Sequence, residues 1–205
     1  MDQQETAGKG TGRLAARDLV TVGIFTALYL VFMMVGGAFF ASNPVLTFWM
    51  PASVALLTGP IYLLLIAKVP KHGPLIVVGV VEGLLLFATG MYWGWAVACV
   101  VLGIAADIIA GIGRFRSKAL NFTAFVVYSL SPMGSYLMLW ANPTGYASYL
   151  VGKGAEQAYM DTMMSTATDW MLPAMVLATV ACAIISGLLG MRLLHRQFEK
   201  AGITA

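Results

Sequence analysis

Residues 19–67 read LVTVGIFTALYLVFMMVGGAFFASNPVLTFWMPASVALLTGPIYLLLIA and contain no Asp, Glu, Lys or Arg. Crossing a hydrocarbon core about 30 Å thick takes about 20 helical residues. The run is therefore too long for one crossing, but it suits two. Gly36-Gly37 and Ser42-Asn43-Pro44 contain turn-forming residues that indicate where the chain reverses. We expect two transmembrane helices here, at about 18–40 and 45–67.

Four further apolar runs follow, each bounded by charged or turn residues. They lie at about 72–90, 92–113, 119–140 and 169–192. The chain of 205 residues is 60% hydrophobic and 10% charged, whereas about a quarter of the residues in a soluble domain are charged. The sequence thus predicts an all-α integral membrane protein, with six transmembrane helices in one domain at 17–200. The segments 1–16 and 201–205 are predicted to be polar cytoplasmic tails.

The basic residues predict the orientation of these helices, because Lys and Arg near span ends are retained on the cytoplasmic side of a membrane. Eleven of the twelve fall on one side of the predicted topology: Lys9, Arg13, Arg17, Lys68, Lys71, Arg114, Arg116, Lys118, Arg192, Arg196 and Lys200. We therefore expect a multi-pass protein of the cell membrane with both termini in the cytoplasm.

The twelfth basic residue, Lys153, lies in the longest predicted loop, at about 141–168, which then faces outside. Within it, the segment 155–164 reads AEQAYMDTMM and predicts a short amphipathic helix lying over the outer face of the bundle. Loops of this length in compact bundles often have a function. The segment is interpreted either as a lid over a binding site or as a passive connector.

Two carboxylates fall within apolar runs, where lipid exposure is costly and a place inside the bundle is expected. Glu82, in the third helix, either binds a ligand or is a protonated group hydrogen-bonded to a neighbouring helix, with its flanking glycines allowing close packing. Asp107 lies late in the fourth helix. We expect it to form an ion pair near the cytoplasmic surface or to contact a partner.

Aromatic and polar side chains gather at the predicted outer helix ends. They are Asn43, Trp49, Tyr92, Trp93, Trp95, Tyr136, Trp140, Asn142, Tyr146, Asp169 and Trp170. Trp and Tyr anchor helices at both membrane interfaces, yet no Trp lies at the predicted inner side. The asymmetry leaves two interpretations, an interfacial belt and an outward-facing pocket for a flat, ring-bearing small molecule.

Small residues recur at helix-packing spacing in the first and last helices. They are Gly23 and Ala27 in the first, and Ala174, Ala178, Cys182, Ser186 and Gly190 in the last. Such stripes allow close approach of another helix, within the chain or from another membrane subunit. Cys99 and Cys182 are expected to be reduced thiols within the membrane.

The sequence contains no G-x-x-x-x-G-K-[ST], H-E-x-x-H or G-x-S-x-G motif and no cluster of Cys or His. We therefore expect no catalytic residue, bound metal, cofactor or nucleic-acid partner. Membrane lipid and a small-molecule substrate are the expected contacts. Any uphill transport would use nucleotide hydrolysed by another protein.

Two segments resemble a known family: Arg17–Tyr29, which reads RDLVTVGIFTALY, and the end of the chain, GLLG at 187–190 with HRQFEKAGI at 195–203. With them, nearly the whole chain resembles the MptD or Trep-Strep family of substrate-binding (S) components of energy-coupling factor (ECF) transporters. The resemblance implies a six-helix bundle that binds a vitamin-like or cofactor-like micronutrient near its outer face. Haem or another tetrapyrrole, a vitamin and a modified base are all candidates.

The resemblance also implies partners and sites. Uptake would require a transmembrane coupling subunit and two ABC ATPases, so the chain would not itself be an enzyme. In S components an A-x-x-x-A pattern on the first helix contacts the coupling subunit, and Gly23-x-x-x-Ala27 is the match here, with Gly replacing the first Ala. The candidate substrate-binding residues are Glu82, Tyr92, Trp95, Tyr136, Trp140, Asn142, Asp169 and Trp170.

Two alternatives come from other functional classes. A membrane enzyme acting on a lipid or isoprenoid would use Glu82 and Asp107 as acid, base or metal ligands, and would require them within about 5 Å of each other. A self-sufficient secondary carrier would be driven by an ion gradient. The sequence lacks the clear internal repeat that such carriers often have.

Overall fold

The computed structural model describes residues 14–200, with side chains described through Leu193. Lys9, Arg13, the side chains of Arg196 and Lys200, and the tail at 201–205 therefore lie outside the described residues, as does most of the tail at 1–16. Every regular element in the described part is helical. The predicted all-α class is confirmed for this part of the chain.

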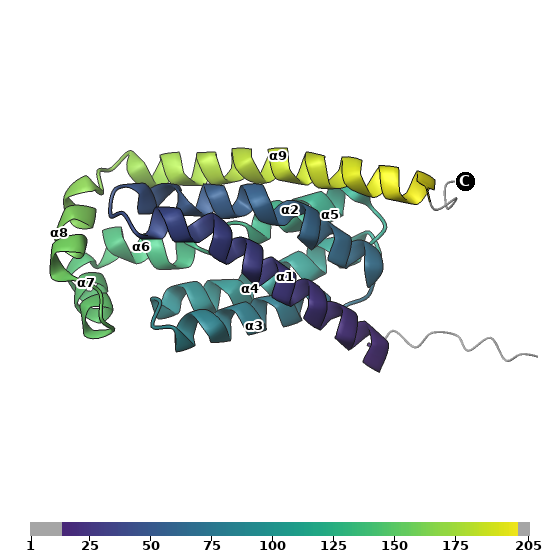
Figure 1. Ribbon diagram of the computed structural model, residues 1–205, viewed down its shortest axis with the longest axis horizontal. Helices are drawn as coiled ribbons and strands as arrows, with labels where there is room; N and C mark the ends of the chain where they lie inside the picture. The colour runs from purple at the N-terminus through teal and green to yellow at the C-terminus, as the bar shows by residue number, and fades with distance from the viewer. Residues whose placement is uncertain (1–13, 201–205) are drawn as a thin grey trace, which may run out of the picture.

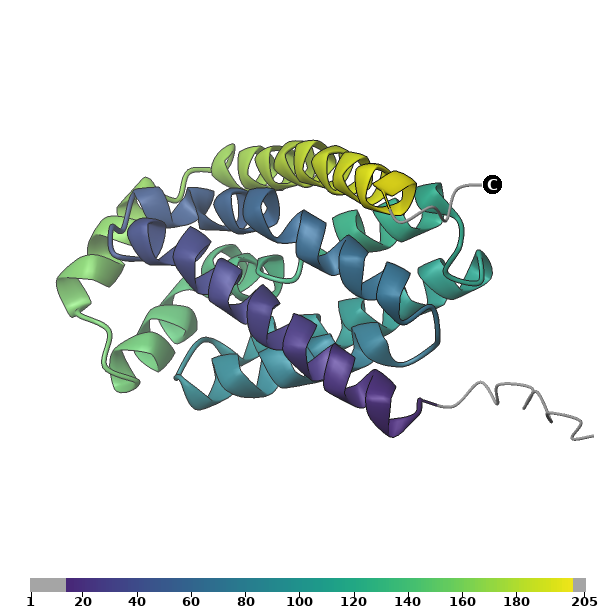
Figure 2. The same ribbon diagram turned by 45° about the vertical axis from the view of Figure 1, so that its right-hand side comes forward.

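The described helices begin and end as follows: α1 Ala16–Ala41, η1 Leu46–Trp49, α2 Met50–Lys68, α3 Pro74–Ala88, α4 Trp93–Ile112, α5 Lys118–Tyr128, α6 Met133–Ala141, α7 Pro143–Gly152, α8 Gln157–Thr166 and α9 Met171–Lys200. The long helices run between the two ends of an elongated bundle, and α7 and α8 gather at one end (Figure 1). Figure 2 shows α8 beside the turn that joins α1 to α2.

Four helical segments are long and apolar enough to cross a membrane, namely 16–41, 46–68, 93–112 and 171–193. A fifth exists if α5 and α6, bent by 42° relative to each other, form one span. The third predicted span corresponds to α3, whose 15 residues measure about 22 Å against a hydrocarbon core of about 30 Å. The structure thus supports an integral membrane protein with four or five spans, and six spans stay a prediction.

The sharpest departure from a simple span is the break between α5 and α6. Pro132 has no amide hydrogen and disfavours helical geometry at the residue before it, so α5 ends before it and α6 starts just after it. The Ser129 hydroxyl donates to Phe125 O at 2.8 Å and closes the last turn of α5. The bend sets α6 on a new direction towards α7 and α8.

The first reversal of the chain occurs at Ser42–Pro44 and not at the two glycines. Asn43 Oδ1 accepts hydrogen bonds from the amides of Val45 at 2.9 Å and Leu46 at 3.1 Å, which fixes the turn. Gly36 stays within α1, where a Cβ atom would lie 3.2 Å from Val54 Cα of α2. The glycines therefore serve close packing between α1 and α2.

The small-residue stripe of α9 packs inside the protein. Pro60 lies within α2, and the neighbouring Gly59 amide donates to Ser186 Oγ of α9 at 3.1 Å. A Cβ atom at Gly190 would lie 3.0 Å from Pro60 Cα. Of the two interpretations of this stripe, the structure supports packing within the chain.

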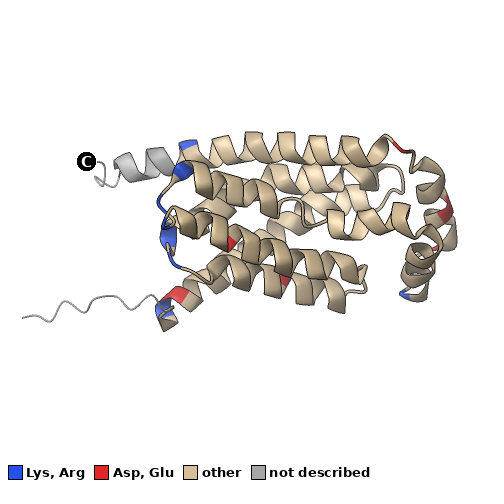
Figure 3. Ribbon diagram, turned by 180° about the vertical axis from the view of Figure 1, so that it is seen from behind, with Lys and Arg blue, Asp and Glu red and all other residues tan. Residues whose placement is uncertain are grey.

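The described basic residues lie at the two ends of the bundle. Among the described residues, Lys and Arg gather at the end where α1 begins and α2 ends, with one exception at the opposite end, where α7 and α8 lie (Figure 3). The exception is Lys153, the residue after α7. We call these the basic end and the α7–α8 end.

Candidate functional site

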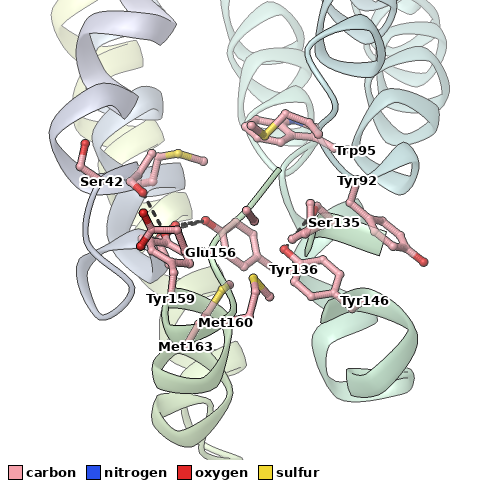
Figure 4. A pocket seen from close by; sticks show the side chains of 16 residues that line it. Ser42, Tyr92, Trp95, Ser135, Tyr136, Tyr146, Glu156, Tyr159, Met160 and Met163 are labelled. Carbon is pink, nitrogen blue, oxygen red and sulfur yellow. Dashed lines mark hydrogen bonds between the residues drawn. The ribbon is translucent and has the colours of Figure 1, made fainter. Parts of the chain in front are cut away.

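A cavity of about 450 Å³ lies at the α7–α8 end, and we call it the end cavity. It is lined by the α1–α2 turn, the start of α4, α6, α7 and α8 (Figure 4). The lining residues are Ala41, Ser42, Thr47, Met50, Met91, Tyr92, Trp95, Ser135, Tyr136, Tyr146, Leu150, Ala155, Glu156, Tyr159, Met160 and Met163. This size falls within the range of about 300–1,000 Å³ that is typical of small-molecule sites.

The lining combines aromatic rings, thioethers and hydroxyl groups. The rings come from Tyr92, Trp95, Tyr136, Tyr146 and Tyr159, and the four thioethers from methionines in α2, α8 and the loop before α4. Rings offer flat apolar faces for stacking, and methionine adapts its shape to a ligand. Such a wall suits a small, ring-bearing organic molecule.

Hydrogen bonds join elements that are distant in sequence around this cavity. The Tyr136 hydroxyl of α6 donates to Thr47 O of η1 at 2.7 Å. The Tyr159 hydroxyl of α8 donates to Ala41 O at the end of α1 at 2.9 Å. These two bonds connect the α1–α2 turn to α6 and α8 and so define one side of the cavity.

The cavity tyrosines outside the membrane-spanning segments keep their protons at physiological pH. Burial raises the pKa of Tyr146 to about 12. Burial also raises the pKa of Tyr159. Both phenols are therefore neutral hydroxyl groups.

The helix α8 has the amphipathic character predicted for residues 155–164. Met160 and Met163 are buried against the cavity, whereas Gln157 and Asp161 are exposed and hydrogen-bonded to each other at 2.8 Å. The observed bounds, Gln157–Thr166, are shifted by two residues from the prediction. A lid must contact the site that it covers, and α8 forms one wall of the cavity. This contact agrees with the interpretation of the segment as a lid.

Three of the eight predicted substrate-binding residues line the end cavity, namely Tyr92, Trp95 and Tyr136. Trp140 instead packs against Phe48, with ring centroids 6.2 Å apart. Asn142 caps α7, because its Oδ1 accepts from the Gly145 amide at 3.0 Å.

Two more of the predicted residues, Asp169 and Trp170, precede α9 and also lie outside the cavity lining. Both are exposed, and Trp170 retains 60% of its accessible surface. Their substrate-binding role, like that of Trp140 and Asn142, stays a prediction without a contact to the cavity.

Glu82 also lies away from the end cavity. It is 2% exposed within α3 and accepts a hydrogen bond from the Tyr128 hydroxyl of α5. A Cβ atom at Gly79 would overlap the Cys99 carbonyl of α4, and one at Gly83 would lie 2.8 Å from Ala96 O. This is the arrangement that the structural interpretation of Glu82 anticipated, with flanking glycines in close helix packing.

Asp107 forms contacts at the basic end. Its carboxylate accepts from the Gly73 amide at 3.0 Å and lies 2.7 Å from His72 Nδ1, so it fixes the start of α3. Glu82 follows Gly73 by nine residues of α3, which is about 13 Å along the axis. The two carboxylates therefore have different partners at different depths of the bundle.

The candidate docking residues lie on an open face of α1. Gly23 and Ala27 are exposed, and a Cβ atom at Gly23 would meet no atom within 4 Å. Neighbouring apolar side chains on α1 are exposed as well, with Val20 at 63% and Ile24 at 56%. Whereas Ser186 and Gly190 of α9 are buried against α2, these small residues of α1 lie on a face that no other described helix covers.

Several cavity residues carried little signal in the sequence. Thr47 and Ser135 have no unusual spacing, and only the chain reversal and the α5–α6 bend bring them to the cavity. Tyr159 and Glu156 belong to the predicted amphipathic segment. The alternation of apolar and polar residues in that segment was the sequence signal that could have placed them at the cavity.

No curated protein and no solved structure matches the chain significantly. A family model does match it, over residues 16–200, which covers all the described helices. Its description agrees with the long apolar helices of the structure. The chain therefore belongs to the Trep_Strep family of hypothetical bacterial integral membrane proteins.

Proposed function

We propose that this protein is the substrate-binding S component of an ECF-type importer and captures a vitamin-like or cofactor-like micronutrient in the end cavity. The observation that carries the proposal is the cavity itself, about 450 Å³ and lined by five aromatic rings. It lies at the end of the bundle opposite most of the Lys and Arg residues (Figure 3). A nutrient receptor requires a preformed site of this kind at its outer surface.

The charge distribution supports the orientation that uptake requires. With the basic end in the cytoplasm, as the retention of Lys and Arg on that side favours, the end cavity faces outside. The first residues of α1 and the last turns of α9 then lie on the cytoplasmic side (Figure 1). In this orientation α8 separates the ligand from the external medium and acts as the lid.

Energy would come from other subunits. The chain has no nucleotide-binding motif, so a transmembrane coupling subunit and two ABC ATPases would supply the work. The open face of α1 around Gly23 and Ala27 suits docking, because small residues allow a second helix to approach closely. Helix α9 lacks such an open stripe, since Ser186 and Gly190 face α2.

The enzyme alternative has less support. It required Glu82 and Asp107 within about 5 Å, whereas Asp107 binds the start of α3 and Glu82 lies about 13 Å further along that helix. Of the side chains that the structure describes, Glu156 is the only acidic one lining the end cavity. The geometry thus favours binding over acid–base chemistry by a carboxylate pair.

Co-purification from the native host tests the proposal. The tagged protein, extracted gently and analysed by native mass spectrometry, should carry a coupling subunit, two ATPases and an additional small-molecule mass. In proteoliposomes, accumulation of that molecule should require ATP and all four polypeptides. Accumulation driven by an ion gradient without ATPases would establish the carrier alternative, and chemical conversion of the molecule would establish the enzyme.

A further inference from the structure

We infer that the end cavity selects an organic cation, a flat molecule of one or two rings with a positive charge at neutral pH. This inference rests on the proposed function, in that it specifies the substrate class of the same site. It follows from the charges, aromatic faces and hydrogen-bond donors of the cavity wall.

The charged groups of the cavity wall are biased towards negative charge. The lining contains one carboxylate, Glu156, and no Lys, Arg or His. Glu156 has no ion-pair partner among the side chains that the structure describes. The stretch 141–170 as a whole carries one positive side chain, Lys153, and three negative ones, Glu156, Asp161 and Asp169, which gives a net charge of −2.

Lys153 does not offset this bias inside the cavity. Its ammonium group lies 5.8 Å from the centroid of the Tyr149 ring, and neither residue lines the cavity. The positive end of the α8 dipole is opposed by Glu156 itself, which occupies the N-cap position of that helix. An anion entering the cavity would therefore find no side-chain cation to pair with.

Several hydroxyl protons at the cavity wall are already donated to groups of the protein itself. Each hydroxyl group has one proton to donate and two lone pairs to accept. The Ser42 proton is donated to Ala38 O at 2.8 Å, and that of Tyr159 to Ala41 O at 2.9 Å. The lone pairs of both oxygens remain as acceptors, so these groups suit a ligand that donates.

The pair of Tyr136 and Thr47 leads to the same result. Because the Tyr136 proton is donated to Thr47 O, the contact of 2.9 Å between the two hydroxyls uses the Thr47 proton. Ser135 and Tyr146 use one of their two protons on each other, at 3.3 Å. The cavity consequently offers more acceptors than donors.

Two donors on the aromatic wall do not change this balance. In Figure 4 the Tyr92 hydroxyl points away from the other labelled side chains. The Trp95 indole N–H has no hydrogen-bond partner among the described residues, but its nitrogen is buried and not exposed to the cavity, so a ligand there does not reach it. A carboxylate or phosphate would thus meet few N–H or O–H groups.

The cavity wall is also rich in aromatic rings. Five rings surround about 450 Å³, and the negative face of an aromatic ring attracts a cation within about 6 Å. Stacking alone would also accept a neutral ring. It is the combination with Glu156 and spare acceptors that favours positive charge. Haem, with two carboxylates, fits this wall poorly.

Three probes of similar size test the inference: N-methylquinolinium, neutral quinoline and the anion quinoline-4-carboxylate. Binding is measured by calorimetry on the full chain in nanodiscs of zwitterionic phosphatidylcholine, so that the lipid surface attracts none of them. We expect N-methylquinolinium to bind at least about tenfold more tightly than quinoline, and the carboxylate to bind more weakly still. Equal or tighter binding of the anion would overturn the inference.

Glu156→Gln and Asp161→Asn form a matched pair of variants, because each removes one negative charge near α8 but only Glu156 lines the cavity. Glu156→Gln should weaken N-methylquinolinium binding by about threefold to tenfold and leave quinoline unchanged. Asp161→Asn should change neither by more than about twofold. If both variants lost the same affinity for N-methylquinolinium, general surface charge would explain the effect, and the proposed cation site would be overturned.

The molecule that co-purifies from the host separates this inference from the proposed function. A bound anion or neutral compound, in the presence of the coupling subunit and ATPases, overturns the cation and leaves the importer standing. A bound cation without any coupling to ATPases overturns the importer and leaves the cation site standing. If neither an endogenous molecule nor any of the three probes binds, both are overturned.

Discussion

The Tyr136 hydroxyl contacts Thr47 twice, donating to its backbone oxygen at 2.7 Å and lying 2.9 Å from its Oγ1. The two residues are 89 positions apart in the chain. Both are buried and line the end cavity. The contact therefore couples the position of α6 to the α1–α2 turn.

Tyr136→Phe should lower the free energy of unfolding, because the buried Thr47 O and Oγ1 atoms lose the Tyr136 hydroxyl as their hydrogen-bond partner. The expected loss is about 1–3 kcal/mol, together with weaker ligand binding. Thermal unfolding in detergent and calorimetry measure the two effects. Tyr149→Phe is the control, since the Tyr149 hydroxyl forms no hydrogen bond among the described residues. Equal losses of stability in both variants would contradict the role of the Thr47 contact.

Ser186→Ala should destabilise the packing of α9 on α2. The Gly59 amide beside Pro60 would lose its hydrogen bond to Ser186 Oγ, and such a bond contributes about 0.5–1.5 kcal/mol. Thermal unfolding of the purified protein measures the change. Thr123→Ala, which removes an exposed hydroxyl bonded to Ala119 O within α5, should shift the unfolding temperature much less.

Glu82→Gln should leave folding and ligand binding nearly unchanged, since the amide oxygen can still accept from Tyr128. Glu82→Leu should lower stability by about 1–3 kcal/mol, because the buried Tyr128 hydroxyl loses its partner. Unfolding and ligand binding are measured on both variants. A folded Glu82→Gln variant without ligand binding would return Glu82 to the substrate site.

Gly23→Phe should abolish coupled uptake and spare ligand binding. A Cβ atom at this exposed position meets no atom within 4 Å, so we expect the fold to tolerate the larger side chain, which prevents a second helix from approaching α1. Transport in proteoliposomes should fall at least about tenfold, the effect of about 1.4 kcal/mol. Val101→Phe, at an exposed apolar position of α4, is the control, and wild-type transport by Gly23→Phe would exclude this face as the docking surface.

Tyr159→Phe should accelerate ligand release. Its hydroxyl joins α8 to the end of α1 through Ala41 O, and losing a hydrogen bond of about 0.5–1.5 kcal/mol corresponds to a rate increase of about twofold to tenfold. Stopped-flow dissociation of N-methylquinolinium measures it. An unchanged rate would mean that α8 does not close the cavity.

Much of the helical framework could be predicted because it depends on local composition. Each of the six apolar runs contains helix, the chain turns at Ser42–Pro44, and the described Lys and Arg residues other than Lys153 share one end. The bend at Pro132 and the short α3 were not predicted, since hydropathy alone does not distinguish one straight span from two packed pieces. Helix α7, Pro143–Gly152, was also missed in a loop expected to hold one helix.

The candidate site was harder to predict, because it depends on contacts between distant segments. Tyr92, Trp95 and Tyr136 were identifiable from the clustering of aromatic residues at helix ends. Glu82 was considered as a ligand-binding residue because a carboxylate exposed to lipid is energetically costly. In the structure the hydrogen bond from the Tyr128 hydroxyl supplies the polar partner that a ligand would otherwise supply. Which solution a chain uses depends on tertiary packing.

The glycine contacts between α3 and α4 also determine where this protein can move. Gly79 faces Gly103 and the Cys99 carbonyl with no side chain between the two backbones. This contact contains no side-chain rotamers that could rearrange. We therefore expect α3 and α4 to move together as one rigid pair. The motions that admit and release a ligand must then be concentrated in α7 and α8, and hydrogen exchange along the chain should be fastest there.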